Sequence, residues 1–67
     1  MVQLSEQIKL RRKKYKLTQA ELAQRAGVGL RFVRDLEQGK TSARMDKVNQ
    51  VLALFGEVLA PVKVSEL

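Results

Sequence analysis

Two arginines near the middle of the chain, Arg31 and Arg34, stand about one helical turn apart and are the first candidates for chemistry. A guanidinium group is a planar donor whose parallel N–H groups match paired acceptors, such as phosphate oxygens or the edge of a guanine. On a helix, both arginines would lie opposite the apolar residues of the same stretch. That apolar side consists of Phe32, Val33 and Leu36. A solvated surface helix carries such arginines equally well, so these residues alone leave both interpretations open.

The chain before these arginines has a well-marked helix start at Thr18. The Thr18 hydroxyl can accept a hydrogen bond from the backbone, and Glu21, three residues later, completes the pattern of a capping box. Leu17 and Leu22 are spaced to pack together as a hydrophobic staple across this start. We therefore expect a short amphipathic helix from Thr18 onward.

Glycines mark the ends of elements in the stretch that follows. Gly27 suits the left-handed conformation in which helices commonly end, and Gly29 lets the chain turn again, so that a second helix begins near Leu30. Gly39 ends this second helix. A capped helix, a glycine-bearing turn and a second helix occur together in DNA-binding helix-turn-helix units. Residues 18–40 therefore predict a helix-turn-helix that binds DNA.

Composition and charge agree with a single small module that has a polyanionic partner. The chain has 67 residues, and 13 Lys and Arg residues against 7 Asp and Glu residues give a net charge of +6. Because cysteine and histidine are absent, we expect no disulfide, no metal site, no cofactor and no enzyme. Residues 1–7 lack a secretory pattern and no run of 18 apolar residues occurs, so we expect a cytoplasmic protein without membrane contact.

Two further helices are expected, one on each side of the helix-turn-helix. Residues 4–15 contain good helix formers, and residues 44–55 carry apolar residues at helical spacing. The residues expected to face the core are Leu4, Ile8 and Tyr15 in the first of these helices, and Met45, Val48, Leu52 and Phe55 in the second. The expected fold class is all-α, with a helical core over residues 4–56 in one domain covering residues 1–67.

The segment 57–64 breaks the helical pattern because it is apolar and rich in β-branched residues. It is expected to form one short strand. Since a lone strand has no partner in an otherwise helical chain, we expect it to pair with the same segment of a second copy in a homodimer. The dimer seam is expected to include Val51, Leu54, Val58, Leu59, Ala60, Val62 and Val64. The alternative is a disordered tail.

The sequence resembles the Cro/repressor-type (XRE) helix-turn-helix proteins over residues 4–55. The segments QAELAQ at 19–24 and LEQGK at 36–40 carry this resemblance. Within the family, the basic segment 31–37 and the terminal strand resemble the HipB-type antitoxins, which pair with HipA-type kinase toxins. The resemblance implies a lambda-repressor-like domain of four helices that binds DNA.

The resemblance also implies roles for individual residues. Gly29, Leu30, Arg31, Arg34 and Asp35 would lie at base edges, and Gln19, Lys40, Thr41 and Arg44 would hold phosphates. Asp35 would orient an arginine or accept from a cytosine amino group, while Gln19 is equally consistent with a solvated side chain and Thr41 with a loop cap. Arg12 would pair with Glu37 at the end of the recognition helix, where an unpaired carboxylate beside the apolar face would be costly.

These features predict a dimeric repressor that binds double-stranded DNA at an inverted-repeat operator. In the antitoxin version, the dimer would repress its own operon and bind a HipA-type kinase toxin, a separate small antitoxin protein, or both. The alternative within the family is a phage-type or stand-alone XRE repressor. A rival of a different class is a protein-interaction subunit whose DNA binding is incidental.

Overall fold

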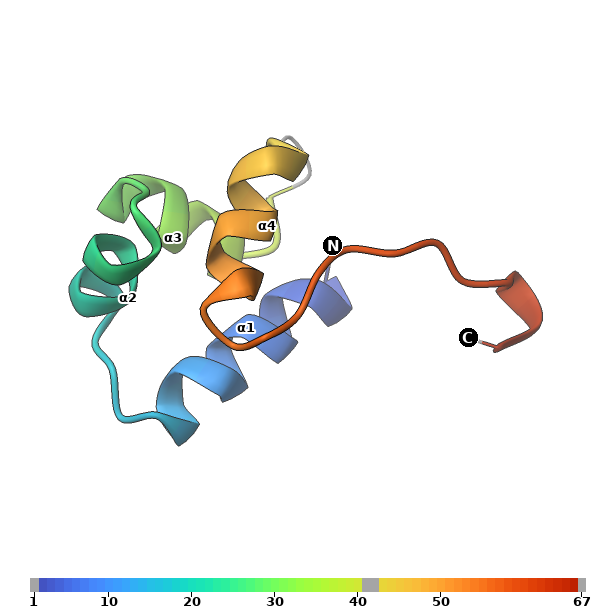
Figure 1. Cartoon of the computed structure of the whole chain (residues 1–67), viewed down its shortest axis with the longest axis horizontal. Coiled ribbons are helices and arrows are strands. Elements are labelled where there is room, and N and C mark those ends of the chain that lie inside the picture. Colours follow the sequence, from blue (N-terminus) through green and yellow to red (C-terminus); the bar gives the residue numbers. More distant parts are fainter. Residues whose placement is uncertain (1, 41–42, 67) are drawn as a thin grey trace.

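Four short α-helices form the body of the protein (Figure 1). The computed structural model describes residues 2–40 and 43–66. The helices are α1 (Val2–Lys14), α2 (Gln19–Ala26), α3 (Leu30–Glu37) and α4 (Met45–Ala53), and a single 3-10 turn, η1, covers Val64–Glu66. The all-α prediction is confirmed for the described residues. None of these helices is long and apolar enough to cross a membrane.

The end of α1 is closed by a Schellman-type pair of backbone hydrogen bonds. The Leu17 N–H donates to the Arg12 carbonyl at 3.1 Å, and the Lys16 N–H donates to the Lys13 carbonyl at 3.0 Å. Lys16 adopts the left-handed conformation that this closure requires, with φ at 57°. Glycine is the usual residue at this position because its missing Cβ removes the steric cost of a positive φ.

Replacing Lys16 by glycine should therefore stabilise the fold. We expect Lys16→Gly to raise the free energy of unfolding by about 1 kcal/mol, measured by urea denaturation, because the left-handed backbone then carries no Cβ penalty. Lys16→Ala removes the same charge but keeps the Cβ, so its free energy of unfolding should stay close to that of the parent. An equal gain in both variants would assign the effect to charge.

The start of α2 has the predicted capping box, which is confirmed. The Glu21 N–H donates to the Thr18 hydroxyl at 3.1 Å, and the Thr18 N–H donates to the Glu21 carboxylate at 2.9 Å. The hydrogen bond from the Thr18 backbone is the main reason that the pKa of Glu21 is lowered, with help from the Thr18 side chain and Arg25. The box therefore persists at neutral pH and weakens only as the pH falls through that lowered pKa. At the other end, Gly27 has φ at 74°, as a left-handed cap requires.

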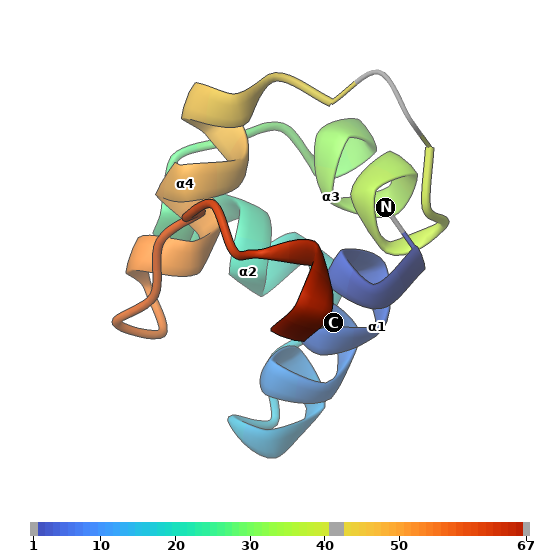
Figure 2. The ribbon, with the colours of Figure 1, turned by 90° about the vertical axis from the view of Figure 1, so that its right-hand side faces the viewer.

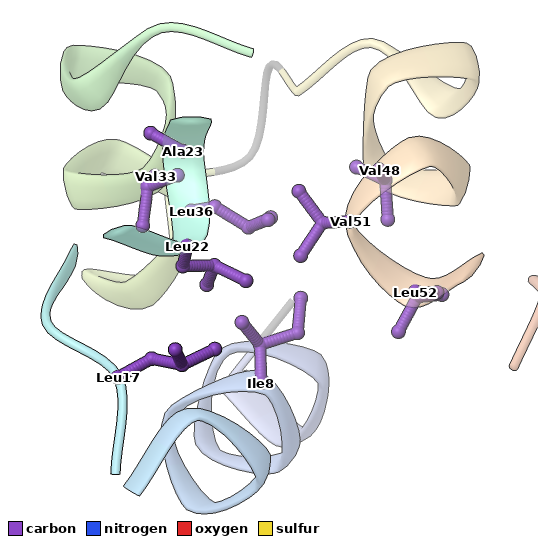
Figure 3. Packing of buried hydrophobic residues seen from close by; sticks show 9 residues of the cluster. All are labelled: Ile8, Leu17, Leu22, Ala23, Val33, Leu36, Val48, Val51 and Leu52. Carbon is purple, nitrogen blue, oxygen red and sulfur yellow. The ribbon is translucent and has the colours of Figure 1, made fainter. Parts of the chain in front are cut away.

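Among the described residues, nine buried apolar side chains from all four helices and the α1–α2 loop form the core (Figure 3). They are Ile8, Leu17, Leu22, Ala23, Val33, Leu36, Val48, Val51 and Leu52. In the contacts between helices, α2 packs against α3 and α4, and α1 packs against α3. The two leucines of the predicted staple, Leu17 and Leu22, both lie in this cluster. The core thus holds the helix-turn-helix between the two flanking helices.

Two predicted core residues lie at the surface instead. Met45 is 72% exposed because α4 begins there, beyond the edge of the core. Tyr15 is 56% exposed because α1 ends one residue earlier, and its ring stacks on Phe55 with centroids 5.5 Å apart. The helical period was correct for both segments, but the two residues lie just outside the stretch that packs.

The segment after α4 is not a strand in this chain. Residues 57–63 have no regular secondary structure and Val64–Glu66 form η1, so the predicted strand at 57–64 is corrected. Its first residues are held to the helical body: Glu57 pairs with Arg11, the Leu59 N–H donates to the Asn49 side chain at 2.8 Å, and Leu59 packs against the core. Beyond these contacts the red end of the chain projects away from the helical body (Figure 1), and it overlaps the helices in Figure 2, where this side faces the viewer. A ladder needs a second segment with free backbone groups, and no other described part of the chain provides one.

Candidate nucleic-acid interface

The helix α3 has one face in the core and one face in solvent. Val33, Leu36 and Glu37 are buried, whereas Arg31 and Arg34 are exposed. The helix periodicity places the two arginines together on the outward face. Both guanidinium groups are therefore available to an incoming ligand.

The first residue on this outward face, Gly29, adopts a conformation open to any residue. It is the N-cap of α3 with φ at −74° and ψ at 151°, and an added Cβ would meet nothing within 4 Å. The expectation that the turn needs glycine here is thus corrected, since the left-handed residue of the turn is Gly27. No side chain caps α3, so its first N–H groups receive no acceptor from residue 29. Leu30 is half-buried and packs against the core, so only part of its side chain faces outward.

A buried polar network holds the far end of α3. The Arg12 Nε donates to Glu37 Oε2 at 2.7 Å, and the Arg12 Nη2 donates to Glu37 Oε1 at 3.0 Å. The same arginine donates to the Leu17 carbonyl at 3.0 Å, and the Gln19 amide donates to Glu37 Oε1 at 3.2 Å. The Arg12 side chain is 15% exposed and the Glu37 side chain only 2%. One network therefore joins α1, the α1–α2 loop, the start of α2 and the end of α3.

Two of the predicted phosphate-binding cations flank the connection between α3 and α4. Lys40 Nζ lies 3.4 Å from Asp35 Oδ1. Arg44 donates to both carboxylate oxygens of Asp46, at 3.1 Å from Nε and 2.7 Å from Nη2. The hydrogen bonds from Arg44 are the largest cause of the lowered pKa of Asp46. Thr41, the remaining predicted phosphate ligand of this loop, lies outside the described residues.

These side chains surround a depression of about 230 Å³ between α3 and α4. It is lined by Phe32, Asp35, Leu36, Lys40, Ala43, Arg44 and Lys47. The Lys47 ammonium lies over the Phe32 ring, 5.9 Å from its centroid. The depression therefore has an apolar floor and a rim on which cations outnumber the single carboxylate.

Comparison with known proteins agrees with this arrangement. The sequence profile of the family described as Helix-turn-helix matches residues 8–58. The chain belongs to the helix-turn-helix family. It is also 51% identical over 57 residues to "Uncharacterized HTH-type transcriptional regulator y4mF" of Sinorhizobium fredii (strain NBRC 101917 / NGR234), a match that covers 81% of this chain and 75% of that protein. Among solved structures none matches significantly.

These matches confirm that the chain resembles the Cro/repressor type, and they do not extend to the HipB-type subfamily.

The structure corrects the assignment of one residue to the dimer seam. Val51 is completely buried within a single chain, because it lies on the side of α4 that packs into the core, and it has no surface to offer a partner. Of the other seam residues, Leu54, Val58, Ala60, Val62 and Val64 are exposed, while Leu59 is half-buried.

Several polar contacts in the structure were not predicted from the sequence. The sequence predicted the ion pair of Arg12 with Glu37, but not the hydrogen bond from the Gln19 amide to Glu37. It also missed the two-point pairing of Arg11 with Glu57, at 3.3 and 3.2 Å, which joins α1 to the segment after α4. The short spacing of Arg44 and Asp46 at the start of a helix is a signal that could have revealed their pair.

Removing one partner of the Arg12–Glu37 pair should destabilise the fold far more than breaking a surface pair would. We expect Arg12→Met to lower the free energy of unfolding by about 3 kcal/mol, since it leaves the buried Glu37 carboxylate without a counter-charge. The double variant Arg12→Met/Glu37→Leu should recover at least about 1 kcal/mol of that loss. Urea denaturation monitored by circular dichroism measures both. A double variant less stable than Arg12→Met would contradict this account of the network.

Proposed function

We propose that this protein is a transcriptional repressor that binds double-stranded DNA through α3. The observation that carries the proposal is the division of that helix into a buried face and an outward face with Arg31 and Arg34. Such a helix fits the major groove, where arginine matches the paired acceptors of guanine. Membership of the helix-turn-helix family and the net charge of +6 support the same ligand.

The buried network supports this proposal because base reading requires a rigid helix. Glu37 is held by Arg12 and Gln19, so the end of α3 is tied to α1 and to the start of α2. At the other end, the uncapped N–H groups of α3 and the exposed Gly29 leave room for a close approach. In this proposal Gln19, Lys40 and Arg44 flank the recognition helix and contact phosphates, which sets its register on the duplex.

The test is a titration of fluorescent duplex from just upstream of the gene against a scrambled duplex. The parent protein should prefer the upstream duplex, and affinity should fall steeply as salt rises. Arg31→Ala/Arg34→Ala should lose at least about tenfold on the upstream duplex, since a bidentate base contact contributes roughly 1–3 kcal/mol. Lys9→Ala/Lys13→Ala removes two cations from α1, and the preference between the two duplexes should survive in it. Equal losses of preference in both double variants would refute base reading by α3.

We also propose that the protein acts as a homodimer on an inverted repeat, with half-sites about one helical turn apart. The support is the apolar surface after α4: Val58, Val62 and Val64 are 67%, 59% and 83% exposed. Apolar side chains that are exposed in a single chain become buried where a partner covers them.

Charging the valines should break the dimer without disturbing the fold of each chain. Val62→Glu/Val64→Glu should convert the protein from dimer to monomer in sedimentation equilibrium and weaken operator binding. Lys63→Glu makes the same change of two units in net charge but leaves the exposed valines in place. It should therefore remain dimeric. A parent protein that sediments as a monomer at tens of micromolar would contradict the dimer.

For the biological role, we propose from the sequence resemblance that the protein is the HipB-type, autoregulating subunit of a toxin–antitoxin operon. Its protein partner would then be a HipA-type kinase or a separate small antitoxin. The Arg31→Ala/Arg34→Ala variant separates the two activities: it should lose operator binding and still co-purify with the product of the neighbouring gene. A stand-alone or phage-type repressor forms no such complex.

A further inference from the structure

The two cations that flank the α3–α4 connection already have carboxylate partners in the protein itself. Arg44 directs two N–H groups at the two oxygens of Asp46, in the fork geometry that arginine also uses for phosphate. Lys40 lies beside Asp35 in a longer contact. The side chains of Lys40, Arg44 and Asp46 are mostly exposed, and that of Asp35 is 38% exposed.

An arginine whose fork is occupied by a carboxylate cannot offer that fork to a phosphate at the same time. While Asp46 holds the Nε and Nη2 edge of Arg44, a phosphate can reach only the remaining N–H groups and lies close to a carboxylate that repels it. The depression between α3 and α4 shows the effect on local charge: Lys40, Arg44 and Lys47 lie on its rim with Asp35, and Asp46 follows at the start of α4. The two carboxylates therefore cancel much of the positive charge of three cations.

From this geometry we propose that Asp46 is an internal competitor of DNA phosphate, which weakens the hold of the protein on any duplex by occupying Arg44. Asp35 acts on Lys40 in the same way. This inference rests on the proposed function and adds to it residues that oppose DNA binding. Because phosphate contacts carry no sequence information, the competition lowers affinity for operator and unrelated DNA alike. The protein is thereby released more readily from unrelated DNA.

The Asp46 pair is not explained by stability alone. Exposed ion pairs contribute little to folding, because solvent screens them and the side chains lose freedom. An acidic residue in the first turn of α4 does favour the helix dipole, and Asp46 occupies that turn. An aspartate is ionised at neutral pH, and the hydrogen bonds from Arg44 lower the pKa of Asp46 further, so the competitor is present under ordinary conditions.

The decisive experiment is a double-mutant cycle on Arg44 and Asp46, read by titration of upstream and scrambled duplexes at several salt concentrations. At low salt, Asp46→Asn should tighten binding to both duplexes by about three- to fivefold, a gain comparable to the loss of one exposed ion pair. The gain should shrink as salt rises. In the Arg44→Gln background, Asp46→Asn should change affinity by less than about twofold, because its target is gone. Thermal unfolding checks that each variant remains folded.

Glu6→Gln is the matched control, because it removes one exposed carboxylate from α1 and changes the net charge by the same amount. A gain in this control equal to that of Asp46→Asn would reduce the effect to net charge and overturn the proposal. If Asp46→Asn raises the affinity for DNA just as much in the Arg44→Gln background, the proposal is also overturned. If the parent protein binds DNA and Asp46→Asn binds no tighter, only this inference fails. If the parent binds neither duplex at low salt, the proposed function fails with it.

Discussion

The burial of the Glu37 carboxylate is the constraint on which the rest of this small structure depends. A carboxylate that is 2% exposed needs an opposite charge and full hydrogen bonding, and Arg12 and Gln19 supply both. Within the described residues, no buried polar side-chain atom lacks a hydrogen-bond partner. Because the partners come from α1 and α2, satisfying this one charge also fixes where α3 lies.

The small size of the core explains why such a polar network matters. Nine buried apolar residues hold together four helices of between eight and 13 residues, and helices this short have little stability on their own. Apolar packing sets which faces meet but tolerates rotation and sliding of a short helix. A two-point ion pair does not tolerate such movement, because its hydrogen bonds require specific distances and angles. The packing and the network together orient the outward arginines of α3.

The charges at the surface follow a different principle from those in the interior. In the interior, pairing compensates the cost of removing charge from water, whereas at the surface it mainly decides which cations are available to a ligand. Arg31 and Arg34 make none of the ion pairs found among the described residues, while Lys40 and Arg44 each have a carboxylate beside them. The outward face therefore combines cations without a carboxylate partner and cations whose charge is partly offset by one.

The sequence by itself determined the local elements: the capping box at Thr18, the left-handed cap at Gly27, the start of α3 at Leu30 and its two faces. These depend on hydrogen bonds and periodicity within a few residues, which a sequence displays directly. Only the tertiary structure decided which predicted apolar residues reach the core, as the exposed Met45 shows. It likewise decided pairs such as Arg11 with Glu57, 46 positions apart, and the course of the segment after α4. Such contacts depend on how the helices pack, and helical periodicity alone does not encode the distance between elements.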